Sequence, residues 1–192
     1  RAPLDPEQQR RVFERYRWSV FLSVTNGYGV FYVCRVNFSV VKKAMLDAGV
    51  LNATEMGIIG SALLVTYAVG KLCNGFLADR ANIRRFLAYS LLLSGGVNLL
   101  CGHRHLFAVF VGLWALNGWV QSTGSAGSVV ALTQWFSFRE RGTRYGLWSM
   151  SHNLGEAFTF AVTGVLVGPL GWRAVFIGPG LIGVIGALVL SR

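Results

Sequence analysis

The chain has 192 residues, of which 53% are hydrophobic and only 14% are charged, and its mean hydropathy is +0.49. A typical soluble domain carries about 25% charged residues, so this composition excludes an ordinary water-soluble protein and indicates a membrane protein. The formal net charge of +10 would suit a nucleic-acid-binding protein, but the basic residues lie mostly in short loops between apolar runs, so we expect no nucleic-acid partner.

Six apolar runs, each of about 17 residues or more, predict six membrane-spanning helices and therefore an all-α membrane protein. The runs cover residues 19–41, 56–78, 86–102, 106–132, 145–169 and 174–190. Residues 1–18 are polar, charged and contain proline, and they are expected to form a partly helical cytoplasmic leader. The chain starts without a methionine and ends directly after the sixth run, so we expect it to be part of a longer protein.

Lysine and arginine are concentrated in alternate loops. Twelve lie in the leader, in the turns after the second and fourth runs, and after the sixth run, whereas the remaining loops hold four. Because positively charged loops stay on the cytoplasmic side of a membrane, this asymmetry predicts that both ends of the segment face the cytoplasm or its topological equivalent. The sequence thus predicts an integral, multi-pass protein whose partner is the lipid bilayer, without indicating which membrane.

Arg35 stands near the middle of the first run. A guanidinium stays protonated, and burying it in hydrocarbon costs about 2.5–3.5 kcal/mol even on the lenient insertion scale, so such a charge usually serves a function such as anion binding. Tyr28, Tyr32 and Arg35 share one helix face, where two hydroxyls and a guanidinium fork suit phosphate oxygens. The alternatives are tyrosines that only pack, and an Arg35 paired with Glu156 or with backbone carbonyls.

The second run repeats this arrangement and ends in a basic turn. Tyr67 and Lys71 are four residues apart and so lie on one helix face, although the long Lys71 side chain could instead reach the cytoplasmic interface. The turn carries four charged residues that we expect to latch helix ends in one conformation rather than to touch a ligand. They are Asp79, Arg80, Arg84 and Arg85, and the alternative is that they supply loop charge alone.

Polar residues recur in the fourth and fifth runs. Gln121 begins a patch of small polar residues that is typical of a cavity lining. Trp148, His152 and Glu156 are spaced four residues apart and share a face, and a neutral imidazole there can donate to phosphate. Glu156 is interpreted as a counter-charge for Arg35 or Lys71 or as a proton site. The alternatives are a histidine satisfied by a neighbouring hydroxyl and a glutamate facing water.

A signature in the turn after the second run resembles that of a known family. The turn reads Gly75-Phe-Leu-Ala-Asp79-Arg80-Ala-Asn82-Ile-Arg84-Arg85 and resembles the Gly-x-x-x-Asp-Arg-x-(Gly)-Arg-Arg signature of the major facilitator superfamily, with Asn82 in place of the usual glycine. Further residues are similar to one branch of it, the organophosphate:phosphate antiporters, which include glycerol-3-phosphate and hexose-phosphate carriers. They are Arg35-Val-Asn37-Phe38, Tyr67-x-x-x-Lys71, Gln121, Trp148-x-x-x-His152-Asn153 and Gly171-Trp172-Arg173.

The similarity begins near Tyr16 and runs to the end of the chain, which is the length of that family's first six-helix half. It implies that residues 19–192 form the N-terminal half of a twelve-helix fold, with a C-terminal six-helix half as partner. It also implies that Arg35 binds a phosphoryl group and that further residues line the substrate cavity, namely Tyr28, Tyr32, Tyr67, Lys71, Gln121, Trp148 and His152. Three positions depart from the family: Val36 often is lysine there, Val130 replaces an arginine, and Glu156 breaks a glycine pair.

The cations and the resemblance together predict a secondary active transporter. It would exchange a phosphorylated metabolite, such as a sugar phosphate or glycerol-3-phosphate, for inorganic phosphate by alternating access. The alternatives are a transporter-like membrane sensor of sugar phosphate and a major facilitator symporter for another organic anion or sugar. We expect no enzyme activity, metal, cofactor or disulfide, because no triad, metal spacing or nucleotide loop is visible and the three cysteines show no pair spacing.

Overall fold

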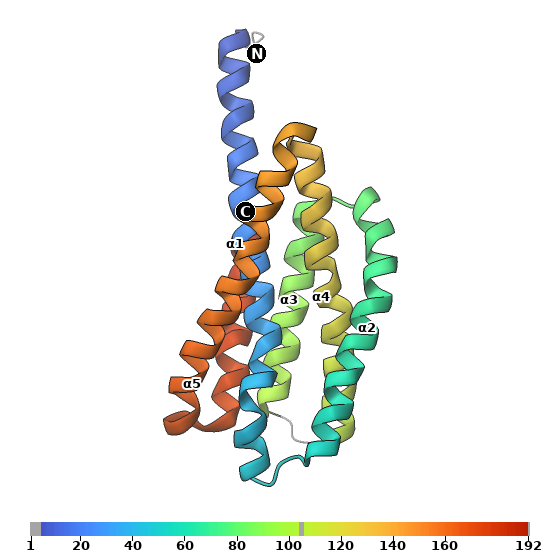
Figure 1. Cartoon of the computed structure of the whole chain (residues 1–192), viewed down its shortest axis with the longest axis vertical. Helices are drawn as coiled ribbons and strands as arrows, with labels where there is room; N and C mark the ends of the chain where they lie inside the picture. The colour runs from blue at the N-terminus through green and yellow to red at the C-terminus, as the bar shows by residue number, and fades with distance from the viewer. Residues whose placement is uncertain (1–4, 104–105, 192) are drawn as a thin grey trace.

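The computed structural model describes residues 5–103 and 106–191, which form a bundle of α-helices without a strand in these two ranges (Figure 1). The helices are α1 (Pro6–Asp47), α2 (Ala53–Arg80), α3 (Ile83–His103), α4 (Phe107–Trp135) and α5 (Phe138–Ser191). The prediction of an all-α fold is confirmed.

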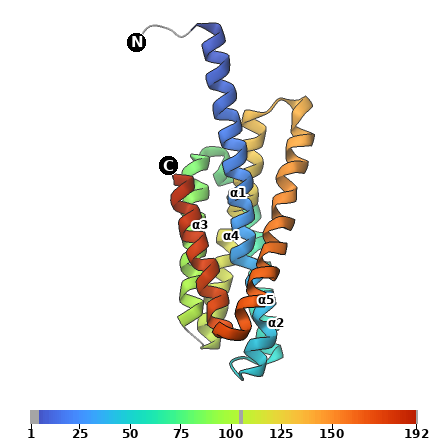
Figure 2. The ribbon, with the colours of Figure 1, turned by 90° about the vertical axis from the view of Figure 1, so that its left-hand side faces the viewer.

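Helix α5 consists of two arms joined at a sharp turn (Figure 2). Gly171 has φ 72° and ψ 176°, a conformation that is essentially restricted to glycine because it has no Cβ. Pro169, two residues earlier, cannot donate to the helical hydrogen-bond ladder. The chain therefore reverses here, and the second arm of α5 returns along the bundle, so that the described residues form six helical rods.

The ends of the first two helices follow from local sequence. Pro6 lies in the first turn of α1, where a missing N–H costs nothing, and the helix continues without a break through the leader into the first apolar run. Helix α2 starts with a capping box: the Asn52 side chain accepts from the Glu55 N–H, and the Glu55 carboxylate accepts from the Asn52 N–H. From Pro6 onward, the leader is thus a helical extension of the first apolar run.

Within the described residues, three helical stretches are long and apolar enough to cross a membrane by length and composition, namely 53–80, 83–103 and 167–191. The other three rods, which are α1, α4 and the first arm of α5, are not among them. The six-span count and its boundaries therefore stay a prediction.

All the strongly basic segments lie at one end of the bundle. Figures 1 and 2 show that the start of α1, the α2–α3 turn, the α4–α5 turn and the end of α5 share this end, whereas the α1–α2 turn and the reversal at Gly171 lie at the other. The guanidinium of Arg84 donates to the carbonyls of Leu190 and Ser191, which joins the start of α3 to the end of α5. The leader projects beyond the bundle at the same end.

Helices α1 and α5 cross at a pair of glycines. A Cβ atom built on Gly155 would lie 2.5 Å from the Gly29 carbonyl oxygen, which is too close for any side chain. Because both residues are glycine, the two backbones approach closely, and the side chains on either side of the crossing face each other. This contact brings the Tyr28–Tyr32 segment of α1 against the Trp148–His152 segment of α5.

We expect Gly155→Ala to separate α1 from α5 and to lower the free energy of unfolding by about 1–3 kcal/mol, the usual cost of overpacking. Gly164 is the matched control, since it lies on the same helix arm and a Cβ there would meet nothing within 4 Å. Gly164→Ala should be neutral or slightly stabilising. Thermal unfolding of both variants in detergent measures the difference, and equal stabilities would contradict the close contact.

Candidate functional site

The predicted stripe of α1 meets the predicted stripe of α5 in an aromatic cluster. The Tyr28 ring lies 4.4 Å from the Trp148 ring, and the Tyr32 ring lies 5.0 Å from the His152 imidazole, measured between centroids. Tyr28 and Trp148 are buried, whereas Tyr32 and His152 are partly exposed. The structure therefore brings together four residues that the sequence assigned to one site from two separate helices.

Arg35 lies between aromatic faces of two helices. Its Cζ is 4.2 Å from the Tyr32 ring centroid and 5.1 Å from that of Tyr67 on α2, both within cation–π range. Lys71 Nζ lies 5.5 Å from the same Tyr67 ring, and the Tyr67 hydroxyl is 3.4 Å from Ser125 Oγ on α4. Tyr67 is thus a shared neighbour of both cations and ties them to α4.

Neither cation is neutralised by a protein group. Among the described residues, no carboxylate oxygen lies within 4.0 Å of Arg35 or Lys71, and neither side chain donates a hydrogen bond. The indole N–H of Trp148 is also buried without an acceptor. An aromatic-walled region with two unpaired cations and unused donors favours an anionic ligand.

A cavity of about 780 Å³ adjoins this cluster and is lined by α1, α2, α4 and α5. It is large enough for a small metabolite. Lys71 and Asp79 lie on its α2 wall, and Trp148 and His152 lie on its α5 wall. The complete lining is Tyr28, Lys71, Leu72, Gly75, Phe76, Asp79, Ser125, Ala126, Val129, Val130, Tyr145, Trp148, Ser149 and His152.

Two predicted site residues lie apart from this arrangement. Gln121 is buried and donates from Nε2 to Ser94 Oγ on α3 at 2.7 Å, so its amide faces the α3–α4 contact and does not line the cavity. Glu156 is partly exposed and forms no ion pair with the described cations. In this conformation, therefore, it does not act as the expected counter-charge for Arg35 or Lys71.

The predicted latch is not formed as an Asp–Arg network. Asp79 has no ion pair among the described residues and instead lines the cavity. Arg84 binds the terminal carbonyls of α5, which a helix C-terminus leaves without intrahelical donors. Arg80 and Arg85 are exposed. Arg84 therefore binds the fixed pair of carbonyls of Leu190 and Ser191, whereas Asp79 is part of the cavity lining.

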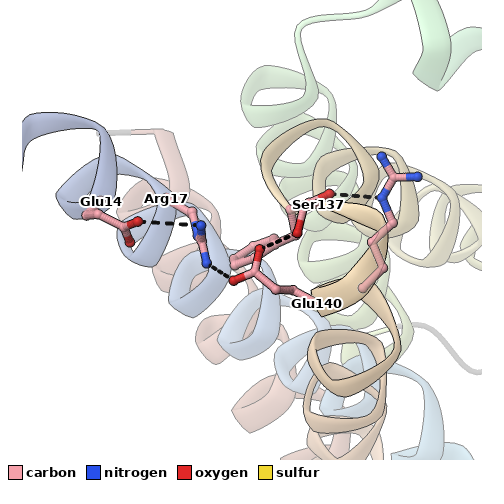
Figure 3. Close-up of polar contacts among 6 residues, drawn as sticks. Glu14, Arg17, Ser137 and Glu140 are labelled. Carbon is pink, nitrogen blue, oxygen red and sulfur yellow. Dashed lines mark hydrogen bonds and ion pairs between the residues drawn. The ribbon is translucent and has the colours of Figure 1, made fainter. Parts of the chain in front are cut away.

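A different ion pair joins the leader to the α4–α5 turn (Figure 3). The guanidinium of Arg17 on α1 donates to the Glu140 carboxylate on α5, and it also lies 3.5 Å from Glu14. Ser137 Oγ donates to the other Glu140 oxygen at 2.7 Å. Sequence analysis missed this pair because its members are 123 residues apart and no pattern within one helix connects them.

Sequence analysis also missed two cavity residues that a pattern did indicate. Tyr145 and Ser149 line the cavity, and they lie seven and three residues before His152. This is the spacing that places residues on one helix face. Tyr145 further packs against Trp148, with ring centroids 5.0 Å apart. Extending the α5 stripe by one turn before Trp148 would have found Tyr145, and widening it to residues three before His152 would have found Ser149.

The sequence matches the family model described as Major Facilitator Superfamily over residues 21–192. The chain belongs to the Major Facilitator Superfamily. This confirms the resemblance of its α2–α3 turn and, together with its apolar helices, makes it an integral membrane protein of a transporter family rather than an enzyme.

Two of three similar relatives are named for hexose phosphate transport, and the third is named a membrane sensor protein. The chain is 35% identical over 186 residues to a probable hexose phosphate transport protein of Chlamydia trachomatis serovar D, covering 97% of this chain and 41% of that protein. It is 33% identical over 192 residues to the membrane sensor protein UhpC of Salmonella typhimurium (98% and 43%). It is 35% identical over 161 residues to the hexose-6-phosphate:phosphate antiporter of Salmonella typhimurium (81% and 34%).

The chain thus spans less than half the length of the curated relatives it matches. A similar solved structure is that of a bacterial homologue of the human lysosomal transporter Spinster, in an inward-facing and unoccupied conformation. Its TM-score is 0.77 at 19% sequence identity, and the match covers 91% of this chain and 42% of the Spinster homologue. At this identity the likeness shows the fold alone. The expected fold, half of a major facilitator bundle, is confirmed.

The ion pair at the leader gives a pH-dependent prediction. The hydrogen bond from Ser137, followed by that from Arg17, lowers the pKa of the Glu140 carboxyl below the ordinary glutamate value of about 4.3. A lowered folded-state pKa means that this contact stabilises the protein above the ordinary value and is lost as pH falls through the folded-state pKa. Glu140→Gln should therefore lower the thermal midpoint at pH 7, and the difference from wild type should shrink toward pH 3.5.

The control is Glu7→Gln. Glu7 pairs with Arg11 at 4.0 Å, but both side chains are more than four-fifths exposed, so water screens the contact and little stability should be lost at either pH. A midpoint difference for Glu140→Gln that stays constant with pH would show that the charge of Glu140 is not what stabilises this junction.

Proposed function

We propose that this chain is the N-terminal half of a secondary transporter that exchanges a phosphorylated metabolite, such as a sugar phosphate or glycerol-3-phosphate, for inorganic phosphate by alternating access. The observation that carries the proposal is the pair Arg35 and Lys71, which no described carboxylate neutralises, beside a cavity of about 780 Å³. The hexose-phosphate carriers among its relatives support the same substrate class.

The charges of site and substrate are complementary. A phosphate monoester carries a charge of about −1.5 to −2 at pH 7, which two cations can balance. Arg35 supplies a planar fork for two phosphate oxygens, and Lys71 supplies a point charge from the neighbouring helix. Hydroxyl, indole and imidazole donors surround these cations and come from Tyr28, Tyr32, Tyr67, Trp148 and His152. Gln121 could bind the same substrate only if α4 rotated about its axis.

Exchange, rather than one-way transport, follows from the uncompensated charge. An empty site holds two cations in a low-dielectric region, which disfavours the reorientation of the helices across the membrane. Bound phosphate or organophosphate neutralises these cations and lowers that barrier. Substrate is therefore needed in both directions, which couples the outward movement of phosphate to the inward movement of its ester.

A second six-helix half completes the unit in this proposal. Helix α2 exposes large apolar side chains, with Leu72 and Phe76 about 70% exposed, next to the cavity that holds Lys71. A C-terminal half packed on this face would close the cavity and keep both cations away from lipid. The share of the relatives that this chain covers, 34–43%, supports the same division.

A membrane sensor of sugar phosphate is the second candidate, because a sensor protein is among the relatives, at 33% identity over 98% of this chain. Both candidates bind the same anion at the same residues. Exchange of radiolabelled phosphate by the full-length protein in proteoliposomes separates them: a transporter exchanges phosphate, and a sensor binds its ligand without transport.

Arg35→Lys should weaken phosphate binding roughly 10- to 150-fold. Lysine keeps the charge but loses the fork, and the loss of a charge-assisted hydrogen bond costs about 1.5–3 kcal/mol. Arg139→Lys is the matched control, since Arg139 is an exposed residue of the α4–α5 turn outside the cavity. Binding and exchange of phosphate by the full-length protein measure both variants, and wild-type exchange by folded Arg35→Lys would remove Arg35 from the site.

We also propose that the basic end of the bundle faces the cytoplasm. The leader, the α2–α3 turn and the α4–α5 turn hold most of the basic residues, and they lie together at this end (Figure 1). This clustering supports the orientation that the positive-inside rule predicts for both ends of the segment.

Thiol labelling in intact cells tests this orientation. Ala48 lies in the α1–α2 turn and Ala81 in the α2–α3 turn, at opposite ends of the bundle. In a Cys73→Ser background, which removes the exposed native thiol, Ala48→Cys should react with an impermeant reagent and Ala81→Cys only after permeabilisation. The reverse pattern would overturn the orientation and the span assignment with it.

A further inference from the structure

The face of α1 opposite the tyrosine stripe is held by a network of buried amides. Asn37 follows Tyr28 by nine residues, which places it on the other side of the helix. Its side chain is fully buried, as are those of Asn98 on α3 and Asn117 on α4. These groups join α1, α3, α4 and the second arm of α5 in one hydrogen-bonded layer.

Two of these amides act on a single backbone carbonyl. Asn98 Nδ2 donates to the Cys34 carbonyl oxygen at 2.8 Å, and Asn117 Nδ2 donates to the same oxygen at 3.2 Å. Ser94 Oγ donates to Asn117 Oδ1 at 2.7 Å, which orients the Asn117 amide toward Cys34. The Cys34 carbonyl therefore receives donors from two helices, although intrahelical bonding alone would satisfy it.

A proline in α5 explains the third member of the network. Pro179 has no N–H, so the Val175 carbonyl four residues earlier lacks its helical donor. Asn37 Nδ2 donates to this carbonyl at 3.0 Å and to Asn98 Oδ1 at 2.7 Å. The thiol of Cys34 lies 3.2 Å from the Pro179 carbonyl. Thus α1 is also fixed against the interrupted segment of α5.

Arg35 is the residue immediately after Cys34. Holding the Cys34 carbonyl fixes the rotation of α1 about its axis, and this rotation decides where the Arg35 side chain leaves the helix. A turn of α1 would carry the guanidinium away from the Tyr32 and Tyr67 rings, which now lie 4.2 and 5.1 Å from it. The described residues make no hydrogen bond to the Arg35 side chain, so these two ring contacts define its position.

We infer that Asn98 and Asn117 are positioning residues for phosphate binding, because they hold the Cys34 carbonyl and so place Arg35 between Tyr32 and Tyr67. This inference rests on the proposed function of Arg35. Both asparagine side chains are fully buried and their amides are bound to the Cys34 carbonyl, so each acts through α1 and not by touching the substrate.

The test uses Asn98→Leu and Asn117→Leu in the full-length protein, since leucine keeps the branched shape of asparagine and removes its donors. A misplacement of about 1 Å can cost roughly 100-fold, so each variant should weaken binding of inorganic phosphate about 10- to 100-fold. The KM for phosphate in exchange should rise more than the maximal rate falls. Asn117→Leu is the milder change, because it removes the longer of the two bonds.

A double variant separates positioning from a general structural role. If Asn117 acts through Arg35, Asn117→Leu should weaken phosphate binding little further in an Arg35→Lys background. Thr123→Val is the matched control: Thr123 is buried on the same helix and donates only to the Val120 carbonyl of α4, so its isosteric replacement should leave phosphate affinity unchanged. Full multiplicative losses in the double variant, or wild-type affinity in folded Asn117→Leu, would overturn the inference.

A measurement that does not use phosphate tests the positioning role separately from the proposed function. In a Cys73→Ser background, Asn117→Leu should change the rate at which a thiol reagent modifies Arg35→Cys, and Thr123→Val should not. An unchanged rate would overturn the positioning role. If the wild-type protein bound no phosphate while this rate did change, the proposed function would fail and the control of Arg35 placement by Asn117 would stand.

Discussion

The placement of two cations without carboxylate partners, Arg35 and Lys71, is the constraint on which the rest of this bundle depends. Lys71 is exposed among the described residues and Arg35 only partly so, and a guanidinium drawn away from water costs several kcal/mol that its surroundings must partly offset. Here the rings of Tyr32 and Tyr67 take the place of counter-ions. A cation–π contact returns only about 0.5–2 kcal/mol, so the site stays incompletely compensated. An anion would complete it, which makes the proposed affinity for phosphate a consequence of how the helices are packed.

That packing depends on small residues at the helix crossings. The Gly29–Gly155 contact lets the backbones of α1 and α5 approach until their aromatic stripes touch. A larger residue at either position would push α1 and α5 apart, and the donors of Tyr28 and Tyr32 would no longer lie next to those of Trp148 and His152. Membrane helices gain little from burying apolar surface in lipid, so close backbone contact is among the main forces available to hold such a pair. Gly29 and Gly155 therefore determine the geometry of the candidate site as well as the packing of the two helices.

The sequence was informative about single helices and less so about pairs of helices. Spacing along one helix put Tyr28, Tyr32 and Arg35 on one face, because helical periodicity is a local property. The rotation of a helix against its neighbours depends on partners far away in sequence, and two side chains have other partners in this conformation than the sequence suggested. Gln121 faces α3 instead of the cavity, and Arg84 binds the end of α5 instead of Asp79. No spacing pattern within one helix indicates the contact of Arg17 with Glu140, because the two residues are 123 positions apart.

The two faces of α1 differ in whether their hydrogen-bond donors have partners. The face with Asn37 packs against other helices, and the face with Arg35 is the proposed ligand-binding face. On the rear face, Asn37 and Asn98 donate to carbonyls or amides of neighbouring helices at 2.7–3.0 Å, and Asn98 also donates to the Ser94 carbonyl of its own helix at 2.9 Å. On the front face, Arg35 makes no hydrogen bond to the described residues, and the buried Trp148 N–H has no acceptor. Buried donors are rarely left unpaired without a reason. The amide donors of Asn37 and Asn98 on the rear face are paired and hold the helix in place, whereas donors on the front face stay unpaired, which is what the proposed anion site requires.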